Sequence, residues 1–153
     1  MKSKTLIVAS IAALSLFACK KERILNNEIY GKWFQERIHD KHISREDYNF
    51  TRDGKVEIVR SLLDKSSKNL KGYYSKEIAS FSVEADSIIL KNIENYWSGG
   101  DGVKPLNELT YSSTSSRMAY KAVYSEDKAQ VTLLFYCPLS ASCIPYPKLT
   151  RVR

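Results

Sequence analysis

The stretch Tyr48–Val59 reads YNFTRDGKVEIV and decides the fold class of this chain. Aromatic and aliphatic residues alternate with other residues on both sides of Asp53-Gly54. Asp-Gly between two alternating runs is a strong short-range signal for a β-hairpin, because the tight turn needs positive φ angles that these residues accept. The sequence therefore predicts two antiparallel strands joined at Asp53-Gly54.

Two further hairpins are predicted beyond this one. Phe81–Ala85 meets Ile88–Leu90 across Asp86-Ser87, and Met118–Tyr124 meets Val131–Cys137 across Ser125–Lys128. A short closing strand is expected at Leu149–Val152. Antiparallel strands at short spacing indicate a mostly β chain, an up-and-down β-barrel or a sandwich of about eight strands with little helix.

Three segments lack a strand pattern. Ser61–Lys71 has a Leu pair among several Ser, so we expect a loop or a short turn of helix. Tyr96–Pro105 contains the run Trp97-Ser-Gly-Gly-Asp-Gly, which predicts a mobile connection. The charged segment His39–Asp47 is expected to form a solvated loop after a strand.

The N-terminus has the pattern of a secretory signal. Lys2 and Lys4 precede the apolar stretch Leu6–Phe17, which is shorter than the ~20 residues of a membrane-spanning helix. The following Leu16-Phe17-Ala18-Cys19 resembles the lipobox of bacterial lipoproteins. That resemblance implies cleavage after Ala18 and acylation of Cys19 by palmitate-type chains, two or more of which anchor a protein stably in a membrane.

These features predict a signal peptide at residues 1–18, a lipidated Cys and tether at 19–29, and a single β domain at 30–153. The expected location is the bacterial cell envelope, lipid-anchored. Lys20 follows the lipid-bearing Cys where an inner-membrane retention signal has Asp, which favours the outer membrane. Both the periplasmic and the surface face stay open.

The charge balance argues against nucleic-acid binding. The formal net charge of +7 falls when Lys2 and Lys4 leave with the signal, and 22 basic residues remain against 17 acidic ones. The basic residues are scattered, whereas a nucleic-acid interface needs them clustered on one face.

Cys137 and Cys143 are the cysteines that remain once Cys19 carries lipid. Export places them in an oxidising compartment, where a disulfide is the expected outcome. A metal pair or a redox couple is the alternative. Their spacing differs from Cys-x-x-Cys and neither His is nearby in sequence, which argues against both.

Neither a catalytic nor a metal site stands out. His39 and His42 with Glu46 are the candidate metal ligands, but Lys41 and Arg45 lie among them and Zn²⁺ needs three or four ligands. No Gly-x-Ser-x-Gly run is present, and only two His exist to serve as bases. We therefore expect no metal, no cofactor and no enzymatic activity.

The aromatic residues offer the better candidate site. Tyr is common in β-strands because it fits a half-buried pleated surface. Trp97, beside a Gly-rich run, is harder to explain as a core residue. We expect Trp97 and the adjacent Tyr96 to contact a ligand or a protein partner, since such rings combine apolar area with a polar group.

Gly31-Lys32-Trp33 and the run Tyr48–Val56 resemble small bacterial lipocalin-like lipoproteins. The resemblance implies a barrel in which Trp33 packs into the base of the core. It predicts a membrane-anchored binding module for a small apolar ligand. The alternative is an envelope protein–protein interaction factor, such as an inhibitor, an immunity factor or an assembly accessory protein.

Overall fold

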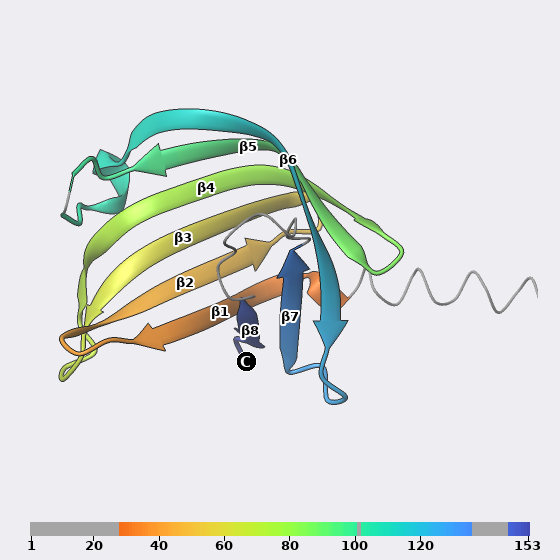
Figure 1. The fold of residues 1–153 in the computed structure, drawn as a ribbon, viewed down its shortest axis with the longest axis horizontal. Coiled ribbons are helices and arrows are strands. Elements are labelled where there is room, and N and C mark those ends of the chain that lie inside the picture. Colours follow the sequence, from red (N-terminus) through yellow and green to blue (C-terminus); the bar gives the residue numbers. More distant parts are fainter. Residues whose placement is uncertain (1–27, 101, 136–146) are drawn as a thin grey trace, which may run out of the picture.

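The computed structural model describes residues 28–100, 102–135 and 147–153. Eight antiparallel strands follow one another in chain order around a closed barrel, and the last strand pairs with the first (Figure 1). They are β1 (Gly31–Ile38), β2 (His42–Phe50), β3 (Lys55–Asp64), β4 (Leu70–Glu84), β5 (Ser87–Trp97), β6 (Thr110–Tyr124), β7 (Gln130–Phe135) and β8 (Lys148–Arg151). The short 3-10 helix η1 (Leu106–Glu108) lies between β5 and β6. The predicted up-and-down barrel is confirmed, and the sandwich alternative is excluded.

The three predicted hairpins form, with their turns at or within one residue of the expected positions. Between β2 and β3, Gly54 has a φ of +77°, and the amide of Thr51 donates to the carbonyl of Lys55 at 2.8 Å. The hairpin between β4 and β5 pairs Glu84 with Ser87, so its turn is Ala85-Asp86, one residue before the expected Asp86-Ser87. The β6–β7 hairpin pairs Tyr124 with Val131, and β8 is the closing strand.

Three local predictions were wrong. Ser61–Lys71 is not a loop or helical turn, because its first residues complete β3, its last begin β4, and only Lys65–Asn69 connect the two. His42–Asp47 belongs to β2, so only His39–Lys41 remain as a turn. Tyr96 and Trp97 end β5 and are not part of the connection that follows. In Ser61–Lys71 the alternation that reveals a strand is interrupted by register shifts between Arg60 and Ser61 and between Leu62 and Leu63.

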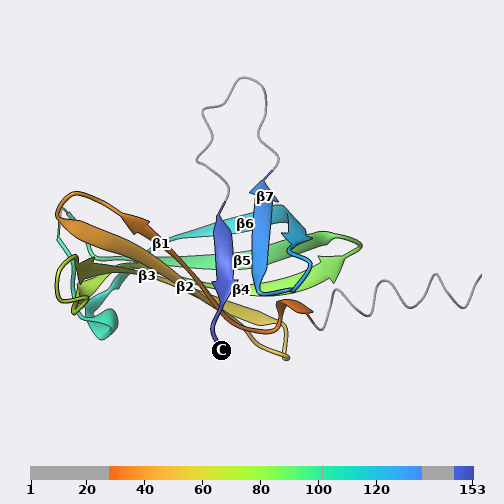
Figure 2. The same ribbon diagram turned by 90° about the horizontal axis from the view of Figure 1, so that it is seen from below.

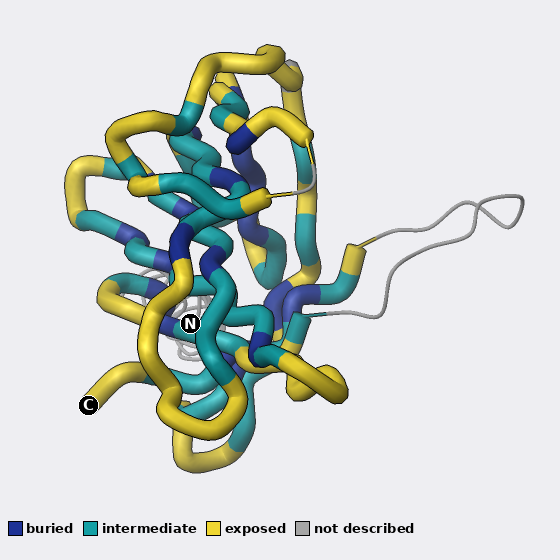
Figure 3. Tube along the Cα trace, turned by 90° about the vertical axis from the view of Figure 1, so that its left-hand side faces the viewer, coloured by how far each residue is buried: buried dark blue, intermediate teal, exposed yellow. Residues whose placement is uncertain are grey.

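Among the described residues, the strand pairs that close the barrel all lie toward one end. β6 pairs with β7 over Tyr120–Tyr124, and β8 pairs with β1 at Trp33 and Phe34 alone. Beyond these pairs β1–β6 continue as a curved sheet whose concave face is open on one side (Figures 1 and 2). We call this half the open end and the half with β7 and β8 the closed end. The hairpins at the open end are exposed (Figure 3).

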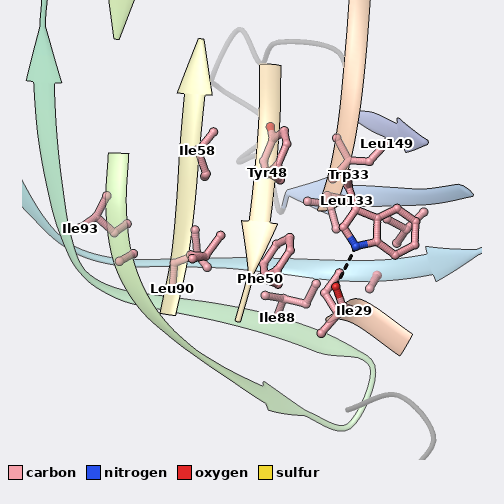
Figure 4. Close-up of a cluster of buried hydrophobic side chains, with 14 residues drawn as sticks. Ile29, Trp33, Tyr48, Phe50, Ile58, Ile88, Leu90, Ile93, Leu133 and Leu149 are labelled. Carbon is pink, nitrogen blue, oxygen red and sulfur yellow. Dashed lines mark hydrogen bonds between the residues drawn. The ribbon is translucent and has the colours of Figure 1, made fainter. Parts of the chain in front are cut away.

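The hydrophobic core fills the closed end (Figure 4). Trp33 is completely buried, and its indole N–H donates to the carbonyl of Ile29 at 2.7 Å. The Arg151 guanidinium, from β8, lies 4.6 Å from the centre of the Trp33 ring. The buried residues of this core are Ile29, Trp33, Tyr48, Phe50, Val56, Ile58, Ala79, Ile88, Leu90, Ile93, Ala122, Val131, Leu133 and Leu149. Side chains therefore occupy the base of the barrel.

Candidate functional site

A row of inward-facing residues crosses the barrel where its core gives way to the open end. Residues directly opposite each other on neighbouring strands project to the same face. Glu46 pairs with Arg60, Arg60 with Ser75, and Ser75 with Trp97. The parallel row one pair nearer the core contains Tyr48, Ile58, Glu77 and Asn95. Polar and aromatic side chains therefore replace the aliphatic ones at this level.

Arg60 is the centre of an ionic cluster in these two rows. Its Nη1 donates to Glu77 Oε1 and, at 3.3 Å, to Ser75 Oγ. Its Nε lies 3.6 Å from Glu46 Oε2, which also accepts a 2.8 Å hydrogen bond from the Tyr48 hydroxyl. The side chains of Arg60, Glu46 and Glu77 are only 25%, 17% and 16% exposed. One guanidinium thus satisfies two largely buried carboxylates.

The cluster changes the protonation chemistry around it. Burial opposes the charge of Arg60, but Glu77 and Glu46 outweigh it and raise the pKa of Arg60 above its ordinary value. Burial, and then the charge of Glu46, raise the pKa of Tyr48 well above its usual range. Burial and the charge of Glu77 raise the pKa of Tyr120 to about 12. At neutral pH both tyrosines are neutral, so Tyr48 serves as a hydrogen-bond donor.

A pocket of about 260 Å³ opens beside this cluster. Its lining combines the two residues predicted from sequence with the ionic cluster and with polar groups of β5 and β6. It comprises Arg60, Ser75, Glu77, Asn95, Tyr96, Trp97, Ser112 and Ser113. The structure thus brings Tyr96 and Trp97 together on one pocket.

The two aromatic residues occupy it differently. Trp97 is 46% exposed and meets the Tyr74 ring edge-on, with ring centres 6.3 Å apart. Tyr96 packs against Tyr111 at 6.0 Å, and its hydroxyl donates to Glu94 at 3.0 Å. The Trp97 indole is therefore the apolar surface that remains accessible to a ligand.

The connection after Trp97 is fastened to β4. The amide of Tyr73 donates to the Lys104 carbonyl at 2.8 Å, and the Lys104 amide returns a bond of 2.9 Å. Gly72 has a φ of +146°, and a Cβ there would lie 2.9 Å from the Val103 side chain. Only glycine permits this approach without displacement, so Gly72 helps to fix the segment that follows Trp97.

Sequence reasoning missed Arg60, Glu77 and Asn95, and it considered Glu46 only as a metal ligand. A signal for the first was present, because Arg60 continues the alternation of Val56 and Ile58 and so falls on the inward face. A charged residue in phase with core residues indicates a buried polar group that needs a partner. The partners themselves depend on strand register, which one strand does not reveal.

Two larger hollows offer fewer free polar groups to a ligand. One of about 520 Å³ lies at the exposed hairpin Ile38–His42, and one of about 390 Å³ borders Arg45. Arg45 is already engaged by Asp47 at 2.8–3.0 Å and by Glu36 at 3.2 Å. The hollow beside it therefore has no free guanidinium to offer.

The predicted histidine pair lies at the first of these hollows. The rings of His39 and His42 stack 4.5 Å apart, and His39 Nε2 lies 3.1 Å from Ser44 Oγ. Glu46 is held inside the barrel by Tyr48 and Arg60. Within the described ranges, no group of three or more His, Cys, Asp or Glu is arranged to hold a metal ion.

The remaining predicted residues, Cys19, Cys137 and Cys143, lie outside the described residues. In the part of the chain that the structure covers, no helix has the length and apolar character needed to cross a membrane. Comparison of the chain with protein-family models, with curated proteins and with solved structures gives no match.

Proposed function

We propose that this chain is a lipocalin-like binding module of the cell envelope, anchored by lipid on Cys19, that holds a small ligand at the open end of its barrel. The single observation that carries the proposal is the half-exposed indole of Trp97 beside the buried Arg60–Glu77 pair. Ligand sites in proteins typically combine apolar and aromatic walls with a few fixed polar groups. This pocket has both.

The pocket's position defines the kind of ligand. The base of the barrel is filled by Trp33, Phe50 and their neighbours, so a ligand cannot enter deeply. The volume of about 260 Å³ is at the lower edge of the ~300–1,000 Å³ range of small-molecule sites. The pocket therefore suits a small ligand, or one end of a larger one, with its apolar part on Trp97.

The polar wall sets the ligand's orientation. Ser75, Asn95, Ser112 and Ser113 supply hydroxyl and amide groups, while the two carboxylates and the guanidinium hold one another in place. Fixed groups of this kind bind without reorganising. Because the charged residues are engaged with each other, we propose binding and not catalysis, with no cofactor and no nucleic-acid partner.

Native mass spectrometry tests the proposal. The full chain would be expressed for export, purified gently from the envelope, and compared with Trp97→Ala and Val123→Ala. Val123 is the matched control, because it is 45% exposed but lies on the paired part of β6. Wild type and Val123→Ala should carry an added mass that organic solvent releases, and Trp97→Ala should lose it.

Two outcomes would contradict this function. A wild-type protein without bound mass shows that the pocket retains no ligand through purification. Equal retention by Trp97→Ala shows that any ligand lies elsewhere. Thermal unfolding of each variant verifies that the fold is intact.

A further inference from the structure

The free edge of β6 is the least protected backbone in the described part of the barrel. β5 pairs with β6 from Thr110 to Lys121, but β7 covers the other edge only from Tyr120 onward. Thr110–Ala119 thus present a strand edge that no described residue pairs with (Figures 1 and 2). Every second residue of such an edge directs its N–H and C=O groups outward, where they can pair with another strand.

Most of this edge lacks the features that normally prevent pairing. Edge strands are usually short, carry charges or Pro, or are bent by a β-bulge. Thr110–Ser116 reads TYSSTSS and contains neither a charge nor Pro, and the side chains of Thr110–Ser115 are exposed. A bulge is present at one end of the segment, between Tyr111 and Ser113, where β6 pairs with Tyr96 and Asn95. The opposite free edge, Gln35–Ile38 of β1, is short and carries Glu36 and Arg37. Of these two edges in the described residues, the β6 edge is therefore the one open to strand addition.

We propose that β6 pairs antiparallel with β6 of a second copy of this chain, with the two-fold axis at Thr114. In this register Thr114 of one copy faces Thr114 of the other, and Ser113 faces Ser115, so uncharged residues meet around the axis. Regular pairing ends at the bulge between Ser113 and Tyr111. No like charges oppose each other between positions 113 and 115.

The symmetry of this edge favours a second copy of the chain as its partner. Ser113-Thr114-Ser115 reads the same in both directions, so a two-fold axis at Thr114 matches each of these residues with one of its own kind. Two-fold interfaces use the same surface patch on both subunits. The two curved sheets would then continue into one another, with both pockets on the same side.

Charge reversal at the axis tests the dimer. The full chain in mild detergent would be compared with Thr114→Lys, Thr114→Glu and the control Val123→Lys, using light scattering coupled to size-exclusion chromatography. At micromolar concentrations wild type and Val123→Lys should have twice the protein mass of a monomer. Each Thr114 variant alone should be monomeric, because like charges then meet at the axis.

Mixing the two Thr114 variants distinguishes repulsion from misfolding. Opposite charges at the axis should restore a one-to-one dimer, which unfolded protein cannot form. A monomeric wild type overturns the proposal. Dimers that persist in Thr114→Lys and Thr114→Glu also overturn it, because they place the interface elsewhere. Neither result bears on ligand retention by Trp97, so the proposed function is judged separately.

Discussion

The two tryptophans show how differently the two ends of this barrel are built. Trp33 at the closed end is fully buried, donates its N–H to Ile29 and is covered by Arg151. Trp97 at the open end is 46% exposed, and its ring makes an edge-to-face contact with the ring of Tyr74. The same side chain is a core residue where β7 and β8 complete the barrel, and an accessible surface where they do not.

The difference extends to the side chains around them. At the closed end the inward residues are aliphatic and aromatic, and their burial supplies the main stabilisation. At the open end the inward residues form an ionic cluster, whose contribution to stability is small unless one partner is removed. The core that supplies most of the stability and the pocket that we propose binds a ligand thus lie at opposite ends of one sheet.

The largest expected effect comes from truncating the buried indole. Trp33→Ala should lower the free energy of unfolding by about 3–5 kcal/mol, because it removes a fully buried aromatic side chain. Trp97→Ala, the matched substitution at the open end, should lower it by less than about 1 kcal/mol. Urea unfolding followed by circular dichroism measures both, and similar losses would contradict the division between the ends.

The next effect concerns the ionic cluster. Arg60→Met should lower the free energy of unfolding by about 2–3 kcal/mol, because Glu46 and Glu77 then lie largely buried without a cation. Adding Glu77→Gln to this variant should recover part of the loss. Arg52→Met, in the exposed β2–β3 turn, is the control and should be nearly neutral. The same urea experiment tests all three variants. If the double variant is no more stable than Arg60→Met alone, Glu77 is not the residue left unpaired.

The smallest effect is a change in alkaline sensitivity. The pKa of Tyr48 is raised by burial and by Glu46, so the folded chain keeps this phenol neutral where the unfolded chain ionises near pH 10. The contribution of the neutral Tyr48 phenol to the free energy of unfolding is complete below pH 10. It declines as pH rises above 10, by up to about 1.4 kcal/mol per pH unit. Tyr48→Phe should therefore make the fall in stability above pH 10 less steep.

Urea unfolding at pH 9, 10 and 11 measures this slope. Tyr111→Phe is the control, because that ring is 59% exposed at the open end. It should keep the wild-type slope. If Tyr48→Phe also keeps it, the phenol is not held neutral by the barrel.

Local chemistry explains what the sequence could predict. The hairpin at Asp53-Gly54 follows from residues that are adjacent in the chain, and so does the accessibility of Trp97 beside Gly99 and Gly100. The Arg60 cluster joins β2, β3 and β4, and its members meet because of the register between these strands. A shift of one residue would turn the side chains of a strand to the other face of the sheet. The prediction for Ser61–Lys71 failed for a related reason, since register shifts between Arg60 and Ser61 and between Leu62 and Leu63 interrupt the alternation in this segment.

The position of Ile29 also sets the direction in which the barrel would face a lipid bilayer. The chain joins β1 at the closed end, where the Ile29 carbonyl accepts from Trp33 and the Glu28 carbonyl accepts from Arg151. Nine peptide steps separate Glu28 from Cys19, and even a fully extended backbone spans only about 30 Å over that length. Acyl chains on Cys19 would therefore keep the closed end next to the headgroups and point the Trp97 pocket away from them, toward molecules arriving from the aqueous side.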